Sequence, residues 1–558
     1  MPRTAKLFIN LIISAAFFNY FIQVLILLLN PGSHLDAWQF AVLFGNLFLF
    51  YGPIWIVFTG VIFFVVQFFA EKKYPIGFFT PPTLTYFLSF TILVVSFVLY
   101  LNYDYYYQFL EGPVKTNFIR VLSINLALVL TGVIFVFFKK ISKKWAQIFF
   151  MAVLLFNVLY GFQATVLSPS KSRTDANKTI QQQPVKNPGT GKPEPRKIRV
   201  VVMDGLSLAV INSLASEQKL LNFSEIINKG VSGRFETIRP NMSLSLLNTA
   251  FSGVKPSHFP LHSFEKFKFA ALDYEFDVRP RFVFFRKSTH FNLTTFYNRN
   301  NSNVIDNLRL HYESKGLKTA NLLRTIPNAT YSELSLTRNN RFVLLFPDLL
   351  KKSDEKDKKY ELLKRYFFFD DYLKGLIPVL KDSTIFYSIV QLPGLGIISR
   401  YFYQYYMPEL FGSITREDPG IKQYGSLLAK YYEYYDSIIG NLMSTTGDNE
   451  LLVIVSFFEY EPLPLWRRIL LHLFGEQDIF VYIPLNSQGT ILMYEKNALK
   501  TAYPIKDVSI LDIYPTLLYY AGFQLSTHLH GEVLKEIFTD EFLLNNPIDI
   551  DTDAPGGQ

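Results

Sequence analysis

Few residues of this chain can do metal or nucleophilic chemistry. The 558 residues include no cysteine, which excludes thiolate nucleophiles, thiolate zinc sites and disulfide frameworks. Beyond residue 198, His528 and His530 stand two positions apart. Such a pair on a strand would share one face and could bind a metal ion. A surface loop near a turn is the commoner setting for two such histidines, and we expect it here.

An acidic residue follows the most strand-like segment of the chain. Ile198–Met203 is apolar and rich in β-branched residues, and Asp204 and Gly205 come directly after it. Chemistry in parallel sheets gathers at the carboxyl ends of strands, so Asp204 is a candidate site residue. A helix cap or a turn would explain an aspartate there as well.

The elements that must position these residues alternate between strand and helix. Apolar runs predict helices at 422–444 and 508–521, and strands at 198–203, 341–346, 384–391, 450–456, 478–483 and 489–494. This alternation predicts an α/β domain at 198–545 with a mainly parallel sheet, followed by a flexible tail at 546–558. Aromatic runs at 367–369, 401–406 and 431–435 fit core packing better than a glycan or lipid site.

The front of the chain has a different character. The chain as a whole is 49% hydrophobic and 17% aromatic, and most of that excess precedes residue 165. Because a membrane-spanning helix needs about 20 apolar residues, we predict a transmembrane anchor of about five helices at 1–164. The predicted spans are 7–30, 39–70, 84–103, 118–138 and 146–164.

The basic residues of the short loops predict an orientation. Lysine and arginine gather before the first span, after the second and after the fourth, whereas the opposite loops hold only Lys115, with Arg120 just inside a span. By the positive-inside rule, the N-terminus is cytoplasmic and an odd number of spans exports the rest of the chain. We therefore expect an integral membrane protein with a periplasmic or extracellular C-terminal domain.

A polar segment separates the two parts. Residues 165–197 are rich in Pro, Lys, Gln and Ser, which is typical of a disordered linker. The net charge of +9 comes from this linker and the membrane flanks, since residues 198–558 are slightly acidic. Without a basic domain, binding of nucleic acid has no support.

Several segments together resemble a known family. The chain from Ile198 to about residue 540 is similar to the alkaline phosphatase superfamily, and most of all to its type I phosphodiesterase/nucleotide pyrophosphatase branch, with a sulfatase-like fold. The segments that carry the resemblance are Ile198–Gly205, Ile226–Gly233, Pro240–Ser243, Phe251–Pro256, Ser509–Leu518, Ala521–Phe523 and His530–Leu534. In architecture alone, the anchor with an external domain resembles lipoteichoic acid synthases and phosphoethanolamine transferases.

The resemblance implies a two-metal site that this chain has largely lost. Family members use two zinc-like ions, held by Asp and His ligands, to activate a Ser or Thr nucleophile. Asp204 matches the first metal ligand and Ser243 falls on the nucleophile position. Other ligand positions carry residues that cannot bind zinc: Gly396, Arg400, Phe457 and Phe458.

Two readings of the remaining polar residues stay open. Arg400 could replace a metal as a fixed positive charge and bind a phosphate or sulfate group. Alternatively, Arg400 pairs with Asp204 as a structural salt bridge, which we favour. Ser243 would then keep only a structural role, as a helix N-cap. Glu459 and Glu461 are acids beside the lost site that a solvated loop explains equally well.

The first hypothesis is therefore a catalytically degenerate domain, a pseudoenzyme, with a structural, regulatory or binding role in a membrane or envelope assembly. It needs no cofactor, and its partners are the lipid bilayer and either other proteins or an envelope polymer. The second is an active phosphodiesterase, sulfatase-like hydrolase or phospho-group transferase that acts on lipids or glycans through Ser243 with two divalent metals. In a third, the domain only spaces and orients the helices inside a larger complex.

Overall fold

The computed structural model describes residues 3–33, 35–70, 82–137, 143–167, 195–259, 261–281, 285–298, 304–323, 331–350, 358–380, 382–411, 417–473, 480–484 and 486–551. It divides into two compact units. The helical unit comprises Met1–Ile180 and Ser257–Asn300, and the sheet unit comprises Gln181–Pro256 and Asn301–Gln558. Most of the predicted linker lies outside the described residues. The continuous domain expected at 198–545 is interrupted, because 257–300 groups with the helices.

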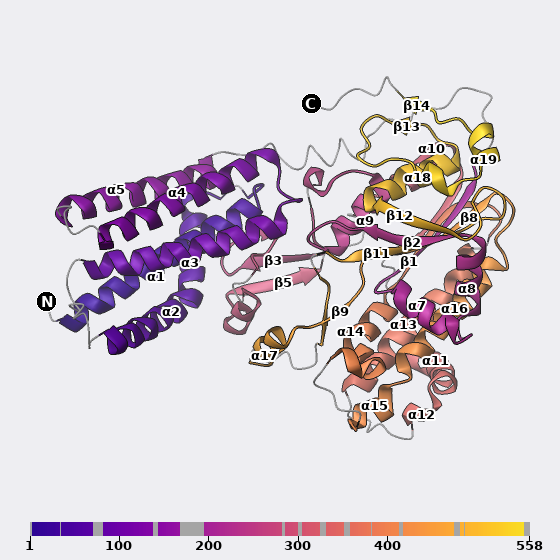
Figure 1. The fold of residues 1–558 in the computed structure, drawn as a ribbon, viewed down its shortest axis with the longest axis horizontal. Coiled ribbons are helices and arrows are strands. Elements are labelled where there is room, and N and C mark those ends of the chain that lie inside the picture. Colours follow the sequence, from indigo (N-terminus) through magenta and orange to yellow (C-terminus); the bar gives the residue numbers. More distant parts are fainter. Residues whose placement is uncertain are drawn as a thin grey trace. The chain divides into compact units, whose positions relative to one another are not determined.

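The helical unit contains five long apolar helices (Figure 1). They are α1 (Arg3–Leu29), α2 (Ala37–Ala70), α3 (Pro82–Tyr106), α4 (Gly112–Phe137) and α5 (Lys143–Phe162). Within the described residues, α1 to α4 are long and apolar enough to cross a membrane, whereas the apolar part of the fifth covers only Met151–Thr165. Four candidate spans therefore replace the five that we predicted. An interior Pro53 lies in α2.

The segment 257–300 forms a small sheet on one end of these helices. Its strands β3 (Glu265–Phe269), β4 (Glu275–Phe276) and β5 (Thr294–Asn298) are antiparallel in the order β4-β3-β5. Asn30, just beyond α1, donates through Nδ2 to the Val278 carbonyl at 2.7 Å and accepts through Oδ1 from the Asp277 and Val278 amides. Asn102 on α3 makes the same two-way contact with the backbone of Arg281.

A third asparagine, Asn46 on α2, donates to the Ala270 carbonyl at 2.9 Å. The late part of α5 lies near the start of α2, since the Phe40 and Phe162 rings are 5.2 Å apart. The end of α1, the start of α2 and the end of α3 therefore meet under one small sheet, and α5 ends beside the start of α2. Successive helices therefore run in opposite directions, as in an up-and-down bundle.

The sheet unit is built on a seven-stranded mixed sheet in the order β12-β2-β11-β8-β1-β7-β6 (Figure 1). Six of the seven strands run parallel and only β11 runs antiparallel to both neighbours, so the sheet is mixed and, as predicted, mainly parallel. The strands are β1 (Lys197–Met203), β2 (Val231–Glu236), β6 (Lys318–Leu322), β7 (Ile385–Leu392), β8 (Glu450–Ser456), β11 (Gln488–Tyr494) and β12 (Tyr503–Ser509).

Helices and short strands complete this unit. The helices are α7 (Leu208–Ser216), α8 (Leu221–Lys229), α9 (Ser243–Ser252), α10 (Asn307–Ser314), α11 (Tyr331–Leu345), α12 (Pro347–Leu350), α13 (Lys358–Leu380), α14 (Gly394–Tyr406), α15 (Pro419–Tyr424), α16 (Leu427–Met443), α17 (Leu465–Leu473), α18 (Ile513–Ala521) and α19 (Asp540–Asn545). Two short pairs stand apart from the main sheet: β9 (Glu461–Pro462) with β10 (Val481–Tyr482), and β13 (Leu525–Ser526) with β14 (Ile550–Asp551).

Some predicted elements need correction. The strand predicted at 341–346 lies mostly in helix α11, where Phe342 and Phe346 pack on Phe367 of α13. Of the strand predicted at 478–483, only Val481 and Tyr482 pair, outside the main sheet. Part of the predicted tail, Ile550–Asp551, is ordered as β14, and 552–558 lies outside the described residues.

Candidate functional site

Three neighbouring parallel strands end at the same edge of the sheet. The register of β7, β1 and β8 places Leu392, Met203 and Ser456 close to that edge. Asp204 follows β1, Gly394 opens α14 two residues after the end of β7, and Phe457 follows β8. The structure thus gathers most of the candidate residues at one set of strand ends.

Asp204 lies directly against the backbone of α14. Its Oδ2 accepts a hydrogen bond from Nε2 of Gln391, at the end of β7, at 3.0 Å. A Cβ placed on Gly396 would come within 2.9 Å of the Asp204 Cβ and 3.0 Å of its carbonyl oxygen. Position 396 therefore has no room for a side chain.

A tyrosine ring lies against the next residue along the chain. Gly205 adopts a positive φ of 74°, and a Cβ there would lie 2.9 Å from the Gly396 Cα and 3.0 Å from the ring of Tyr460. Burial raises the pKa of the Tyr460 hydroxyl, and the Arg400 charge opposes this while the Asp204 charge adds to it. Both charged candidates therefore act on the Tyr460 hydroxyl.

Arg400 does not form the salt bridge that we favoured. It lies half-buried on α14, and among the described residues no ion pair within 4.0 Å joins it to Asp204. Gln391 is one hydrogen-bond partner of the Asp204 carboxylate. Arg400 remains a cation close to the strand ends.

The two phenylalanines form part of the core. The Phe457 ring makes edge contacts with Phe235 of β2 and Phe251 of α9, and both Phe457 and Phe458 are buried. Phe458 packs edge-on against Tyr460. Aromatic carbon thus occupies the end of β8, where a metal site would need oxygen or nitrogen ligands.

Glu459 has a structural role that the sequence did not reveal. Its carboxylate accepts hydrogen bonds from the Leu208 amide at the start of α7, from Thr490 of β11 and from the guanidinium of Arg234 on β2. Its side chain is 19% exposed, so it does not lie in a solvated loop. Glu459 ties three elements together at the carboxyl end of β8.

Ser243 lies on the surface at the start of α9. It is the first residue of that ten-residue helix, and the N-cap position is Met242. The prediction that Ser243 is the N-cap is therefore wrong. The far half of the same helix carries Phe251, which contacts Phe457.

A buried carboxylate lies beneath the turn between β7 and α14. Asp370 on α13 is fully buried and accepts hydrogen bonds from the hydroxyls of Tyr431 and Tyr435 and from the amide of Gly394. Burial raises the pKa of Asp370 to about 7, although these hydrogen bonds lower it, and the Asp204 charge raises it further. The network fixes the turn that brings Gly396 to Asp204.

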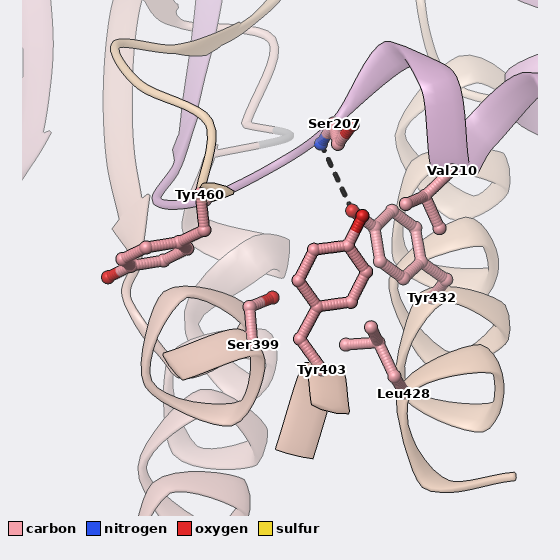
Figure 2. Close-up of a pocket in the computed structure, with 8 residues that line it drawn as sticks. Ser207, Val210, Ser399, Tyr403, Leu428, Tyr432 and Tyr460 are labelled. Carbon is pink, nitrogen blue, oxygen red and sulfur yellow. Dashed lines mark hydrogen bonds between the residues drawn. The ribbon is translucent and has the colours of Figure 1, made fainter. Parts of the chain in front are cut away.

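A hollow near these strand ends is small. Figure 2 shows the rings of Tyr403, Tyr432 and Tyr460 around it, with the Ser207 amide donating to the Tyr432 hydroxyl at 3.0 Å. Ser399, Val210, Leu428 and Gly205 complete the lining. It has room for about one water molecule.

Candidate metal ligands outside the strand ends do not cluster either. His528 and His530 lie in a turn after β13 and not on a strand, so they do not share a strand face. Within the described residues, no group of three or more His, Asp or Glu side chains could hold a metal ion. The donors present around Asp204 therefore do not fit two zinc-like ions.

Comparisons with known proteins identify no family for the chain. Neither a protein-family model nor a curated protein sequence matches it. Among solved structures it is similar to murine ectonucleotide pyrophosphatase/phosphodiesterase 5, an inactive variant in complex with AMP. That similarity covers 62% of this chain and 100% of the murine chain, with 10% identity and a TM-score of 0.34, which is too low to establish a shared family.

Proposed function

We propose that this chain is a membrane-anchored protein whose sheet unit is a catalytically inactive, phosphodiesterase-like domain with a binding or structural role in a membrane or envelope assembly. The observation that carries the proposal is the contact between Gly396 and Asp204. The strand ends where chemistry would occur are closed by backbone and aromatic rings.

The chemistry of the site supports the same proposal. Two divalent ions need several anionic or imidazole ligands at about 2 Å, and Asp204 is one carboxylate. Phe457 and Phe458 offer no lone pair, and Arg400 is a permanent cation. Glu459 is already engaged by Arg234, Thr490 and the start of α7.

A second candidate function is favoured by one pair of observations. Ser243 is exposed at the N-terminus of α9, and Arg400 has no ion pair with Asp204. A serine nucleophile and a fixed cation could act together on phosphodiester or sulfate groups of lipids or glycans if the site brought them together and a base were supplied. This candidate needs a rearranged site and two bound metals or a substitute for them.

The test uses the full-length protein purified in detergent. Zinc, manganese and calcium are measured by elemental analysis, and hydrolysis of bis(p-nitrophenyl) phosphate is followed for wild type and Ser243→Ala. Ser216→Ala, an exposed serine at the end of α7, is the matched control. We expect substoichiometric metal and equal, background-level turnover in all three proteins. Two metals per chain, with turnover lost only in Ser243→Ala, would overturn the proposal in favour of the second candidate.

We further propose that the N-terminus is cytoplasmic and that the sheet unit is extracytoplasmic. The lysines before α1 and between α2 and α3 support a cytoplasmic N-terminus. An extracytoplasmic sheet unit requires α5 to cross as a fifth span in addition to the four candidates, and the contact of Phe162 with Phe40 at the start of α2 supports that crossing. Because the chain has no cysteine, single cysteines at Lys6 and Lys496 report orientation by labelling of intact cells with a membrane-impermeant maleimide. Labelling at Lys496 alone is expected, and labelling at Lys6 alone would reverse the orientation.

A further inference from the structure

The segment that connects β9 to β10 contains a helix with exposed apolar residues, α17. α17 is nine residues long, with the sequence LWRRILLHL, and contains no acidic residue. Leu465, Trp466 and Ile469 are 66%, 61% and 53% exposed. In the described part of the sheet unit, other exposed large apolar side chains are placed singly along the chain, at Leu221, Leu336, Leu344, Leu410, Leu544 and Ile550.

The three exposed residues share one helical face. Positions 465 and 469 are one turn apart, and Trp466 adjoins them on the same side. Arg468, on the other side of α17, donates to the carbonyl of Phe411 at 3.1 Å and so ties the helix to another segment of the sheet unit. Leu465, Trp466 and Ile469 together form an apolar patch, whose exposure to water is unfavourable.

Cations flank this surface. Arg467 lies over the rings of Trp466 and Tyr482, and Arg468 lies over Phe480. An apolar face with tryptophan, edged by arginines and free of acids, is the composition of a helix that lies in a membrane interface. At about 13 Å, nine helical residues are too short to span a bilayer but long enough to lie flat in its headgroup region.

We propose that α17 is a membrane-interface helix, whose Leu465, Trp466 and Ile469 insert among the lipids of an anionic bilayer surface. Two observations favour an anionic bilayer as the partner of α17. Its two arginines attract anionic headgroups, and the candidate membrane spans of the same chain supply a bilayer. This proposal is independent of whether the site at Asp204 is active.

The segment from β9 to β10 also bears on the sheet. Its first strand, β9, starts four residues after Phe457 at the carboxyl end of β8, and β10 closes it. A helix fixed in the headgroup layer would therefore restrain the strand-end face of the sheet relative to the bilayer surface. Ligands of that face would then be lipid headgroups or polymers that lie close to the membrane.

The test uses the full-length chain in lipid nanodiscs. Leu465→Cys and Ile469→Cys, each the only cysteine of the chain, are labelled with an environment-sensitive fluorophore. The discs contain either phosphatidylcholine alone or a mixture with phosphatidylglycerol, with or without lipids that carry a nitroxide near the headgroup. Leu221→Cys on α8 and Leu544→Cys on α19 are matched controls, since both are exposed leucines on helices of the same unit.

The expected result is quenching by nitroxide lipids of about twofold or more at positions 465 and 469 in anionic discs, and no quenching at the controls. Arg467→Glu should weaken the quenching, and so should removal of phosphatidylglycerol. A blue-shifted but unquenched label at 465 would mean that protein covers α17 and would overturn the proposal. The proposal would also be overturned if the labels at all four positions had the same emission, typical of exposure to water, and none were quenched.

Discussion

At the scale of single residues, the closure of the strand ends depends on a position without a side chain. Gly396 approaches Asp204 so closely that a Cβ would meet the Asp204 Cβ at 2.9 Å and its backbone at 3.0 Å. A flexible side chain could move aside, but backbone cannot move without displacing β1. The packing of α14 on β1 therefore leaves no room for a metal-binding side chain at position 396.

Gly396→Asp, which restores a carboxylate at this position, is expected to destabilise the sheet unit and to bind no metal. Overpacking of this kind costs about 1–3 kcal/mol. Thermal unfolding of the full-length protein in detergent, with elemental analysis alongside, measures both effects. Gly375→Asp on α13 is the matched control, because a Cβ there meets nothing within 4 Å. An unchanged melting temperature with stoichiometric zinc in Gly396→Asp would contradict the closed site.

The buried carboxylate at Asp370 predicts a pH dependence of stability. Its pKa is about 7 in the folded protein, against an ordinary value of 3.8, because burial disfavours the charged form. A raised folded pKa means that its contribution is fully present below about pH 4 and is lost as the pH rises through 7. The folded protein should therefore lose stability between pH 5 and pH 8.

Asp370→Asn removes this titration while keeping an oxygen that accepts hydrogen bonds. Relative to wild type, the variant should gain on the order of 2 kcal/mol between pH 5 and pH 8. Asp306, whose pKa burial raises to about 6, titrates in both proteins and cancels from the difference. The prediction fails if the difference in melting temperature between variant and wild type is the same at both pH values.

Sequence reasoning located Asp204 and the neighbouring strand ends but missed what fills them. Asp204 was found because a parallel strand ends there, and that signal is local. The partners of Glu459, namely Arg234 and Thr490, come from other strands and leave no local signal. The pairing predicted between Arg400 and Asp204 was wrong for the same reason. Nothing in the sequence indicated that Gln391 would donate a hydrogen bond to the Asp204 carboxylate.

At the scale of elements, buried strands were predictable and half-exposed ones were not. β1, β7, β8 and β11 are mostly apolar and almost fully buried, because both of their faces are covered. β2 alternates buried and more exposed residues, and the edge strand β12 contains Pro504, Lys506 and Asp507. Neither segment was therefore predicted as a strand. The prediction at 341–346 mistook an apolar helix end for a strand, since Phe342 and Phe346 suit either.

The asparagines under the 257–300 sheet predict a measurable restraint. Asn30→Ala would leave the Val278 carbonyl and two buried amides unpaired, at about 1–3 kcal/mol for each group that water cannot reach. Hydrogen–deuterium exchange should rise at Asp277 and Val278, and the melting temperature should fall.

Asn46→Ala serves as the graded control, because that side chain makes one hydrogen bond, to Ala270, with the same sheet. It should have a smaller effect, confined to the neighbourhood of Ala270. Equal protection of residues 277 and 278 in wild type and Asn30→Ala would show that the asparagine does not hold the segment.

At the scale of the whole molecule, the chain passes between its two units three times. It does so near Ile180, after Pro256 and after Asn300. A single tether, which the sequence predicted at 165–197, would leave the sheet unit attached by one segment only. The insertion was not predictable, because its partners are asparagine side chains on helices that resemble ordinary apolar spans.

A protease recognition sequence inserted after Ile180 tests this connectivity. After cleavage, the fragment that contains the sheet unit should remain in the membrane fraction through residues 257–300, even in high salt. A second site, inserted in the same way after Leu323, cuts the sheet unit itself and controls for access of the protease. Release of the fragment into the soluble fraction after the first cut alone would contradict the assignment of 257–300 to the helical unit.

The asparagine contacts also set an order of events during synthesis. Asn30 leaves the ribosome with the first helix, but its partner Asp277 is 247 residues further along the chain. Asn30 therefore lacks these partners until residues 181–256, the first part of the sheet unit, have been translated. The helical unit is therefore completed late, and a stall in translation between residues 30 and 277 would leave it incomplete.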